Sequence, residues 1–95
     1  MKFRLFVCDS NASSKLAVHN AKLLMKSLNS DDNTLEVIDV LENPEAAEEA
    51  RILATPTLIK DEPPPVRMLV GDLSDMARVR AVLQLPTKIT EETSR

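Results

Sequence analysis

The chain has 95 residues, of which 43% are hydrophobic and 28% are charged, and its formal net charge is −3. This length suits one small domain, and the composition is typical of a folded protein rather than a disordered one. Because the chain is acidic, lacks Trp and Tyr, and has no apolar run of the roughly 20 residues that span a bilayer, we expect a cytoplasmic protein that binds neither nucleic acid nor membranes.

The N-terminal half predicts a strand, a long helix and a second strand. Alternating apolar residues over 3–7 predict the first strand. Apolar residues then recur at helical spacing over 14–28, and Ser14 is the expected N-cap of that helix. A mostly apolar, β-branched segment over 35–40 predicts the second strand. Two strands joined by a helix in this way are expected to be parallel, with a right-handed crossover.

A short second helix is predicted over 44–53. Asn43 is a favourable N-cap residue, and Pro44 is favourable at the first helical position. The apolar residues that this helix would present are Ala46, Ala47, Ala50 and Leu53.

The C-terminal half predicts two further strands, over 57–60 and 66–70. The three consecutive prolines at 63–65 form the connection between them, because proline cannot lie inside a central strand. Gly71 ends the fourth strand and is the only glycine of the chain, which predicts a positive φ or a hinge there. Pro56 precedes the third strand, where thioredoxin-like folds commonly have a cis proline; an ordinary trans proline at a strand start is the alternative.

The last element, over 74–85, fits two structures. Ser74 can cap a helix there, but the apolar residues at 79–85 also alternate as in a strand. We predict a helix, because Pro86 would end a helix at this point. The residues that would share one helical face are Met76, Val79 and Leu83.

The predicted fold is α/β, a thioredoxin-like βαβαββα arrangement in a single domain over residues 1–85. Residues 86–95 are polar and begin with proline, so we expect them to form a disordered C-terminal tail.

Cys8 lies where a thioredoxin-like fold carries its redox site, between the first strand and the first helix. Redox exchange there needs a second thiol close by to resolve the mixed disulfide, and the position two residues further on is Ser10. His19 is the only histidine and has no partner at metal-ligand spacing, and no catalytic pair of carboxylates is recognisable. We therefore expect no enzyme, metal or cofactor, and keep a monothiol oxidoreductase as the alternative.

Four residues at helical spacing form a basic stripe along the first predicted helix. They are Lys15, His19, Lys22 and Lys26. Such a stripe either binds an acidic partner or is a solvated face, and the solvated face is the simpler interpretation.

Three segments of the sequence, at 37–44, 52–58 and 70–75, carry a family resemblance. They read VIDVLENP, ILATPTL and VGDLSD, and in combination they resemble the KaiB family of circadian clock proteins over about residues 5–85. The resemblance implies a protein-binding module that binds a KaiC-like ATPase in circadian or stress-related signalling. Further partners it implies are a KaiA-like protein and a sensor histidine kinase, and a sensory domain that partners such a kinase is a related alternative.

The KaiB family is also known for fold switching between a thioredoxin-like monomer and a tetrameric ground state. Pro86 would truncate the last strand of that second fold, so we expect a monomer or weak dimer rather than a tetramer. The resemblance gives structural or switch roles to Pro56, Gly71, Asp72 and Ser74.

By the same resemblance, the second half of the chain carries the partner contacts. The residues expected at the interface are Ala47, Ala50, Arg51, Lys60 and Arg67. Lys60 and Arg67 would reach out on either side of the proline turn, unless they are simply solvated charges at strand ends. The second strand, at 36–40, would be a sheet edge open to strand addition by another partner.

Overall fold

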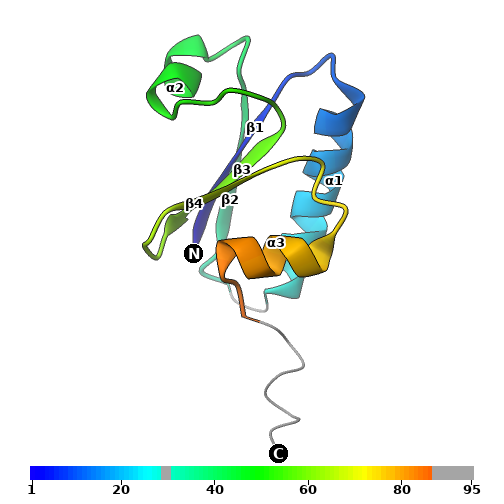
Figure 1. Ribbon diagram of the computed structural model, residues 1–95, viewed down its shortest axis with the longest axis vertical. Helices are drawn as coiled ribbons and strands as arrows, with labels where there is room; N and C mark the ends of the chain where they lie inside the picture. The colour runs from blue at the N-terminus through cyan, green and yellow to red at the C-terminus, as the bar shows by residue number, and fades with distance from the viewer. Residues whose placement is uncertain (29–30, 87–95) are drawn as a thin grey trace, which may run out of the picture.

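The computed structural model describes residues 1–28 and 31–86. Its elements follow the predicted βαβαββα order (Figure 1). They are β1 (Lys2–Val7), α1 (Ala12–Ser27), β2 (Thr34–Asp39), α2 (Pro44–Glu49), β3 (Thr57–Glu62), β4 (Arg67–Val70) and α3 (Met76–Leu83). Apart from Pro86, the predicted C-terminal tail lies outside the described residues.

The four strands form one mixed sheet in the order β2-β1-β3-β4. As predicted, β1 and β2 are parallel, while β3 pairs antiparallel with both β1 and β4. Strands β2 and β4 are therefore the two edges of the sheet. Within the described residues no helix is long and apolar enough to cross a membrane.

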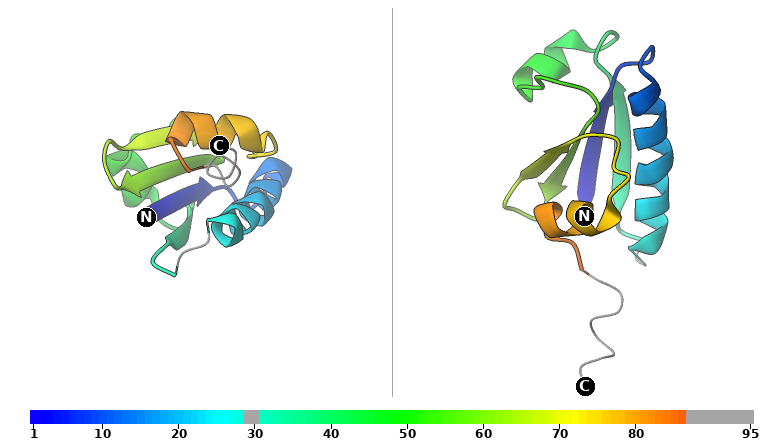
Figure 2. Two further views of the ribbon diagram at one scale, coloured as in Figure 1. Left: turned by 90° about the horizontal axis from the view of Figure 1, so that it is seen from below. Right: turned by 45° about the vertical axis from the view of Figure 1, so that its right-hand side comes forward.

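Helices cover the two faces of the sheet unequally (Figure 2). Helices α1 and α3 pack on one face over the larger core, in which Phe3, Leu5 and Leu83 are almost completely buried. Burying each such side chain contributes about 1.5–3 kcal/mol. Helix α2 lies on the other face over a small core of Phe6, Ile38 and Ile59, so much of that face is not covered by any helix.

The start of α1 differs from the prediction. Asn11 has extended backbone angles, and its side-chain oxygen accepts a hydrogen bond from the Ser13 N–H at 2.7 Å, so Asn11 is the N-cap. Ser14 lies inside the helix and is buried, and its hydroxyl accepts the Cys8 N–H at 3.0 Å. The predicted cap at Ser14 is wrong because its hydroxyl closes the preceding loop instead.

Helix α2 ends at Glu49, four residues before the predicted end. Arg51 adopts a left-handed conformation with φ 58°, and two backbone bonds close the helix around it. The Arg51 N–H donates to the Glu48 carbonyl and the Ile52 N–H to the Ala47 carbonyl, both at 3.0 Å. This pairing is the Schellman motif, which turns the chain out of the helix. Leu53, expected on the helix, follows the turn instead.

Helix α3 confirms the helical prediction for the ambiguous last element, over a shorter range. Its N-cap is Asp75, whose carboxylate accepts the Arg78 N–H at 3.1 Å, so the predicted cap at Ser74 is wrong. The Ser74 N–H instead donates to the Asp72 carboxylate at 3.0 Å, within the turn. Gly71 has the predicted positive φ, at 133°.

Candidate protein-binding surface

The loop that would carry thioredoxin chemistry holds a single thiol. Cys8 follows β1, and its Sγ lies 3.5 Å from the Ser10 Oγ. Pro56, in the cis form, precedes Thr57, which lies opposite Phe6, so the proline sits at the end of the sheet where this loop begins. Since Cys8 is the only cysteine of the chain, the chain itself supplies no resolving thiol. Among the described residues no group of His, Cys, Asp and Glu could hold a metal.

The predicted contact residues on α2 are only partly available. Ala47 and Ala50 pack against the small core under the helix and are half-buried. Arg51 is exposed at the turn that ends the helix. The structure therefore places one of these three side chains fully at the surface.

The two predicted cations near the proline turn have opposite environments. Arg67 is exposed, whereas Lys60 is only 3% exposed. Lys60 alternates with Ile59 along β3, so its side chain points to the face that α1 and α3 cover, opposite Phe3 on β1. The expectation that Lys60 reaches outward to a partner is wrong, because strand alternation turns it into the sheet's covered side.

An exposed apolar surface that was not predicted from the sequence lies beside α2, and we call it the β4 face. Its residues and exposed fractions are Leu53 at 98%, Val66 at 58%, Met68 at 44% and Val70 at 53%. Met68 lies opposite Ile59 and so faces the side of the sheet that carries α2. The signal in the sequence was the two-residue alternation over 66–70, in which Leu69 alone is buried.

Two connections fix the geometry of the β4 face. Val70 lies opposite Thr57 at the start of β3, and the Gly71 N–H donates to the Pro56 carbonyl at 2.9 Å. The segment that carries Leu53 therefore enters the sheet beside the end of β4. Met68 and Val70 share one side of β4, Val66 precedes the strand, and Leu53 lies on the segment that leads into β3, so the exposed apolar residues follow the β4 edge of the sheet.

An ion pair lies next to the β4 face on the same side of the sheet. The Arg4 Nε and Nη2 donate to the two Asp61 carboxylate oxygens at 2.7 and 2.9 Å, in a bidentate geometry. The Arg4 guanidinium also lies 5.4 Å from the centre of the Phe6 ring. The hydrogen bonds that Arg4 donates to the Asp61 carboxylate raise the pKa of Arg4 further above its ordinary value. This pair holds two charged groups together on the central strands β1 and β3, on the sheet face that α2 covers only in part.

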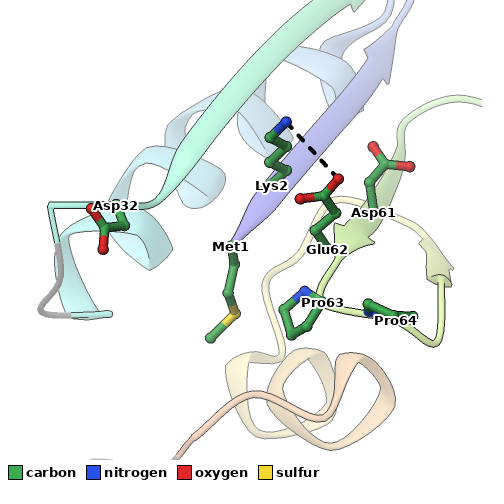
Figure 3. A pocket seen from close by; sticks show the side chains of 7 residues that line it. All are labelled: Met1, Lys2, Asp32, Asp61, Glu62, Pro63 and Pro64. Atoms are coloured by element: carbon green, nitrogen blue, oxygen red, sulfur yellow. Dashed lines mark ion pairs between the residues drawn. The ribbon is translucent and has the colours of Figure 1, made fainter.

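A shallow hollow of about 630 Å³ lies at the N-terminal end of the sheet (Figure 3). It contains one exposed ion pair, between Lys2 and Glu62 at 3.9 Å. Its lining residues are Met1, Lys2, Asp32, Asp61, Glu62, Pro63 and Pro64. None of the residues expected at a binding or catalytic site lines it.

The KaiB domain family model matches residues 4–85 of the chain. The chain belongs to the KaiB family. It is 46% identical over 90 residues to the circadian clock oscillator protein KaiB of Nostoc sp., covering 94% of this chain and 83% of that protein. The corresponding protein of Gloeothece citriformis is 45% identical over 82 residues, covering 86% of this chain and 77% of that one. The likeness predicted from three short segments is thus confirmed over most of the domain.

Solved structures confirm the thioredoxin-like fold of this KaiB-family chain. The N-terminal domain of Synechococcus elongatus SasA has a TM-score of 0.69 and 28% identity, covering 93% of this chain and 87% of that one. Thioredoxin 1 of Thermosipho africanus has a TM-score of 0.72 and 22% identity, covering all of both chains. At that identity the second likeness concerns the fold alone, and implies no thiol chemistry for Cys8.

Proposed function

We propose that this KaiB-family chain is a non-enzymatic, cytoplasmic binding module that docks onto a KaiC-like ATPase through the β4 face and regulates circadian or stress-related signalling. The observation that carries the proposal is the exposed apolar group at Leu53, Val66, Met68 and Val70 on a domain matched over residues 4–85 by the KaiB model. Exposed apolar surface gains free energy when a partner covers it, at about 25 cal/mol per Å².

Charged residues at the rim of the β4 face support the same assignment. Arg51 is exposed at the end of α2. Arg67 is exposed on the edge strand β4, but it lies opposite Lys60 and alternates with Met68, so it borders the β4 face from the other side of the sheet edge. Cations at the rim of an apolar patch favour encounter with an acidic partner surface and add specificity. We therefore retain Arg51 and Arg67 as partner contacts, with Ala47 and Ala50 beside them.

Two further partners follow from the family. Likeness to the N-terminal domain of SasA supports a sensor histidine kinase as a competitor or alternative partner. Strand β2 is an edge of the sheet and Val37 on it is 43% exposed, which suits strand addition by a KaiA-like protein.

The test is the affinity of the purified chain for the KaiC-like ATPase of the same organism. We expect the double variant Met68→Thr/Val70→Thr to bind at least tenfold more weakly, or about 1.4 kcal/mol. Threonine keeps the strand propensity of β4 while removing apolar contact. Arg67→Glu alone should also weaken binding, whereas a charge reversal at Lys60 would bury a carboxylate and unfold the test protein.

Leu41→Ala is the matched control, because Leu41 is 70% exposed like the apolar residues of the β4 face but lies in the turn between β2 and α2. It should bind the ATPase within about twofold of the natural chain, which is within the scatter of contact-free substitutions. Unchanged affinity of the folded Met68→Thr/Val70→Thr variant would remove the β4 face from the interface.

A further inference from the structure

One side of α1 is exposed, basic and partly apolar, and we call it the α1 outer face. Its residues are Lys15, Leu16, His19, Lys22, Leu23 and Lys26, all of them exposed. In Figure 2, α1 runs along the outside of the molecule with no other element over its outward side. The sixteen residues of α1 include no Asp or Glu.

Helical geometry gathers these six residues into one strip. At about 100° per residue they fall within roughly a third of the helix circumference. The residues buried in the larger core, among them Ala17, Ala21 and Leu24, point the opposite way. Leu16 and Leu23 are seven residues apart, as are Lys15 and Lys22, so the strip repeats with the period that two packed helices share.

The charge of this strip is not compensated locally. Within residues 1–28 and 31–86 no ion pair or hydrogen bond reaches the ammonium groups of Lys15, Lys22 or Lys26. The acidic residues gather elsewhere, notably around α2. Those exposed there are Glu42, Glu45, Glu48 and Glu49. A basic face on a chain of net charge −3 therefore presents a local field of opposite sign to the rest of the molecule.

We propose that the α1 outer face docks an amphipathic helix of a partner protein that carries apolar residues seven apart, flanked by Asp or Glu. Leu16 at 43% exposure and Leu23 at 48% exposure form the apolar seam. Lys15 and Lys22 flank this seam as the charged positions beside a helix–helix seam do, and pair with the partner's carboxylates. His19 and Lys26 extend the positive surface along the same side.

The same observations disfavour two other occupants. A helix that lies in a membrane surface buries a broad apolar face with Trp, Phe or several Leu residues, and this strip has two half-exposed leucines and no aromatic residue. A nucleic acid would need a basic chain or stacking side chains, and the strip offers a few lysines on an acidic protein.

The test uses the full chain and a fluorescent 21-residue helical peptide with leucines at seven-residue spacing and glutamates beside them. Anisotropy should show binding that weakens as salt rises, since the charge pairs are exposed. Leu16→Ala/Leu23→Ala and, separately, Lys15→Glu/Lys22→Glu should each weaken binding at least tenfold. Alanine preserves the helix propensity of α1, and circular dichroism checks the fold.

Two controls separate this docking from general charge attraction. Arg78→Glu reverses an exposed cation on α3, outside the face, and should leave peptide affinity within about twofold. A scrambled peptide of the same composition should bind at least tenfold more weakly than the heptad peptide. Equal binding of both peptides would overturn the proposal. So would binding to phosphatidylserine vesicles but not to the peptide, or peptide binding that the leucine variant leaves unchanged.

Discussion

Gln84 ends α3 in a conformation that glycine adopts more readily than any other residue. Its φ and ψ are 58° and 50°, in the left-handed region, and its side chain is exposed. The Gln84 N–H donates to the Ala81 carbonyl at 3.3 Å and the Leu85 N–H to the Arg80 carbonyl at 2.8 Å. This is a second Schellman motif, and Leu85 is buried beneath it. We predict that Gln84→Gly stabilises the protein.

The magnitude follows from two opposing effects. A left-handed conformation costs an L-residue about 1–2 kcal/mol. Glycine removes that cost, but it gives the unfolded chain more conformational entropy, worth about 0.4–1 kcal/mol. The net gain should be about 0.5–1 kcal/mol, or roughly 3–6 °C in Tm for a domain of this size. Thermal and urea unfolding followed by circular dichroism would measure it.

Ala81→Gly is the matched control for this prediction. Ala81 is exposed within the same helix, so the substitution adds one glycine to the same segment. There it should lower the free energy of unfolding by about 1 kcal/mol. If Gln84→Gly also lowered the Tm, the left-handed end of α3 would not describe the folded protein, and the helix would end differently.

Four further expectations concern other parts of the chain. Lys60→Met should raise the free energy of unfolding by about 1 kcal/mol in a urea titration, because it removes a buried ammonium group from the covered side of the sheet; a loss of stability would show that Lys60 has a stabilising partner. The Ser74 hydroxyl and N–H lower the pKa of Asp72, so this carboxylate should stabilise the fold above its ordinary pKa, and the contribution should disappear as pH falls through the lowered value. Asp72→Asn should reduce that acid dependence of Tm, and identical profiles would contradict the assignment. Sedimentation at tens of micromolar, a working range for weak self-association, should give a monomer or weak dimer, and a stable tetramer would refute this. Neither the natural chain nor the Cys8→Ser variant should show disulfide reductase activity. Disulfide reduction by the natural chain that the Cys8→Ser variant lacks would establish the oxidoreductase alternative.

The order of elements was predictable because the spacing of apolar residues and the positions of turn residues agreed along the chain. Two-residue alternation predicted β1, helical spacing predicted α1, and Gly71 predicted the turn with positive φ. Local pattern fitted both a helix and a strand at α3, and Pro86 favoured the helix because it would end one at that point. These features depend on residues near one another in sequence, so the sequence alone carries them.

The helix ends were not predictable, because neighbouring polar residues compete for the same backbone groups. Asn11 and Ser14 can both cap α1, and the outcome depends on whether the Ser14 hydroxyl is taken up by Cys8 in the loop. Likewise, Asp75 and Ser74 compete at α3. Nothing in the sequence indicates that an arginine or a glutamine will adopt a left-handed backbone conformation. The early end of α2 at Arg51 was therefore missed.

The candidate site was harder to predict than the fold, because exposure depends on which helix covers which part of the sheet. Lys60 on β3 and Met68 on β4 lie on adjacent strands, and their side chains point to opposite faces of the sheet. Lys60 is buried, whereas Met68 is at the surface. From the sequence alone, a lysine within a strand is expected at the surface, and an apolar residue such as Met68 is expected in the core. Met68 is exposed instead, because the short helix α2 does not reach the β4 edge of the sheet face on which it packs.

The two proposed binding surfaces lie on opposite sides of the sheet. Met68 and Val70 face the side on which α2 packs, whereas α1 is anchored on the other side through Ala17 and Ala21. Side chains of the β4 face and of the α1 outer face therefore share neither neighbours nor a common core. Substitutions separated in this way usually act additively. One surface can consequently be altered while the other stays intact.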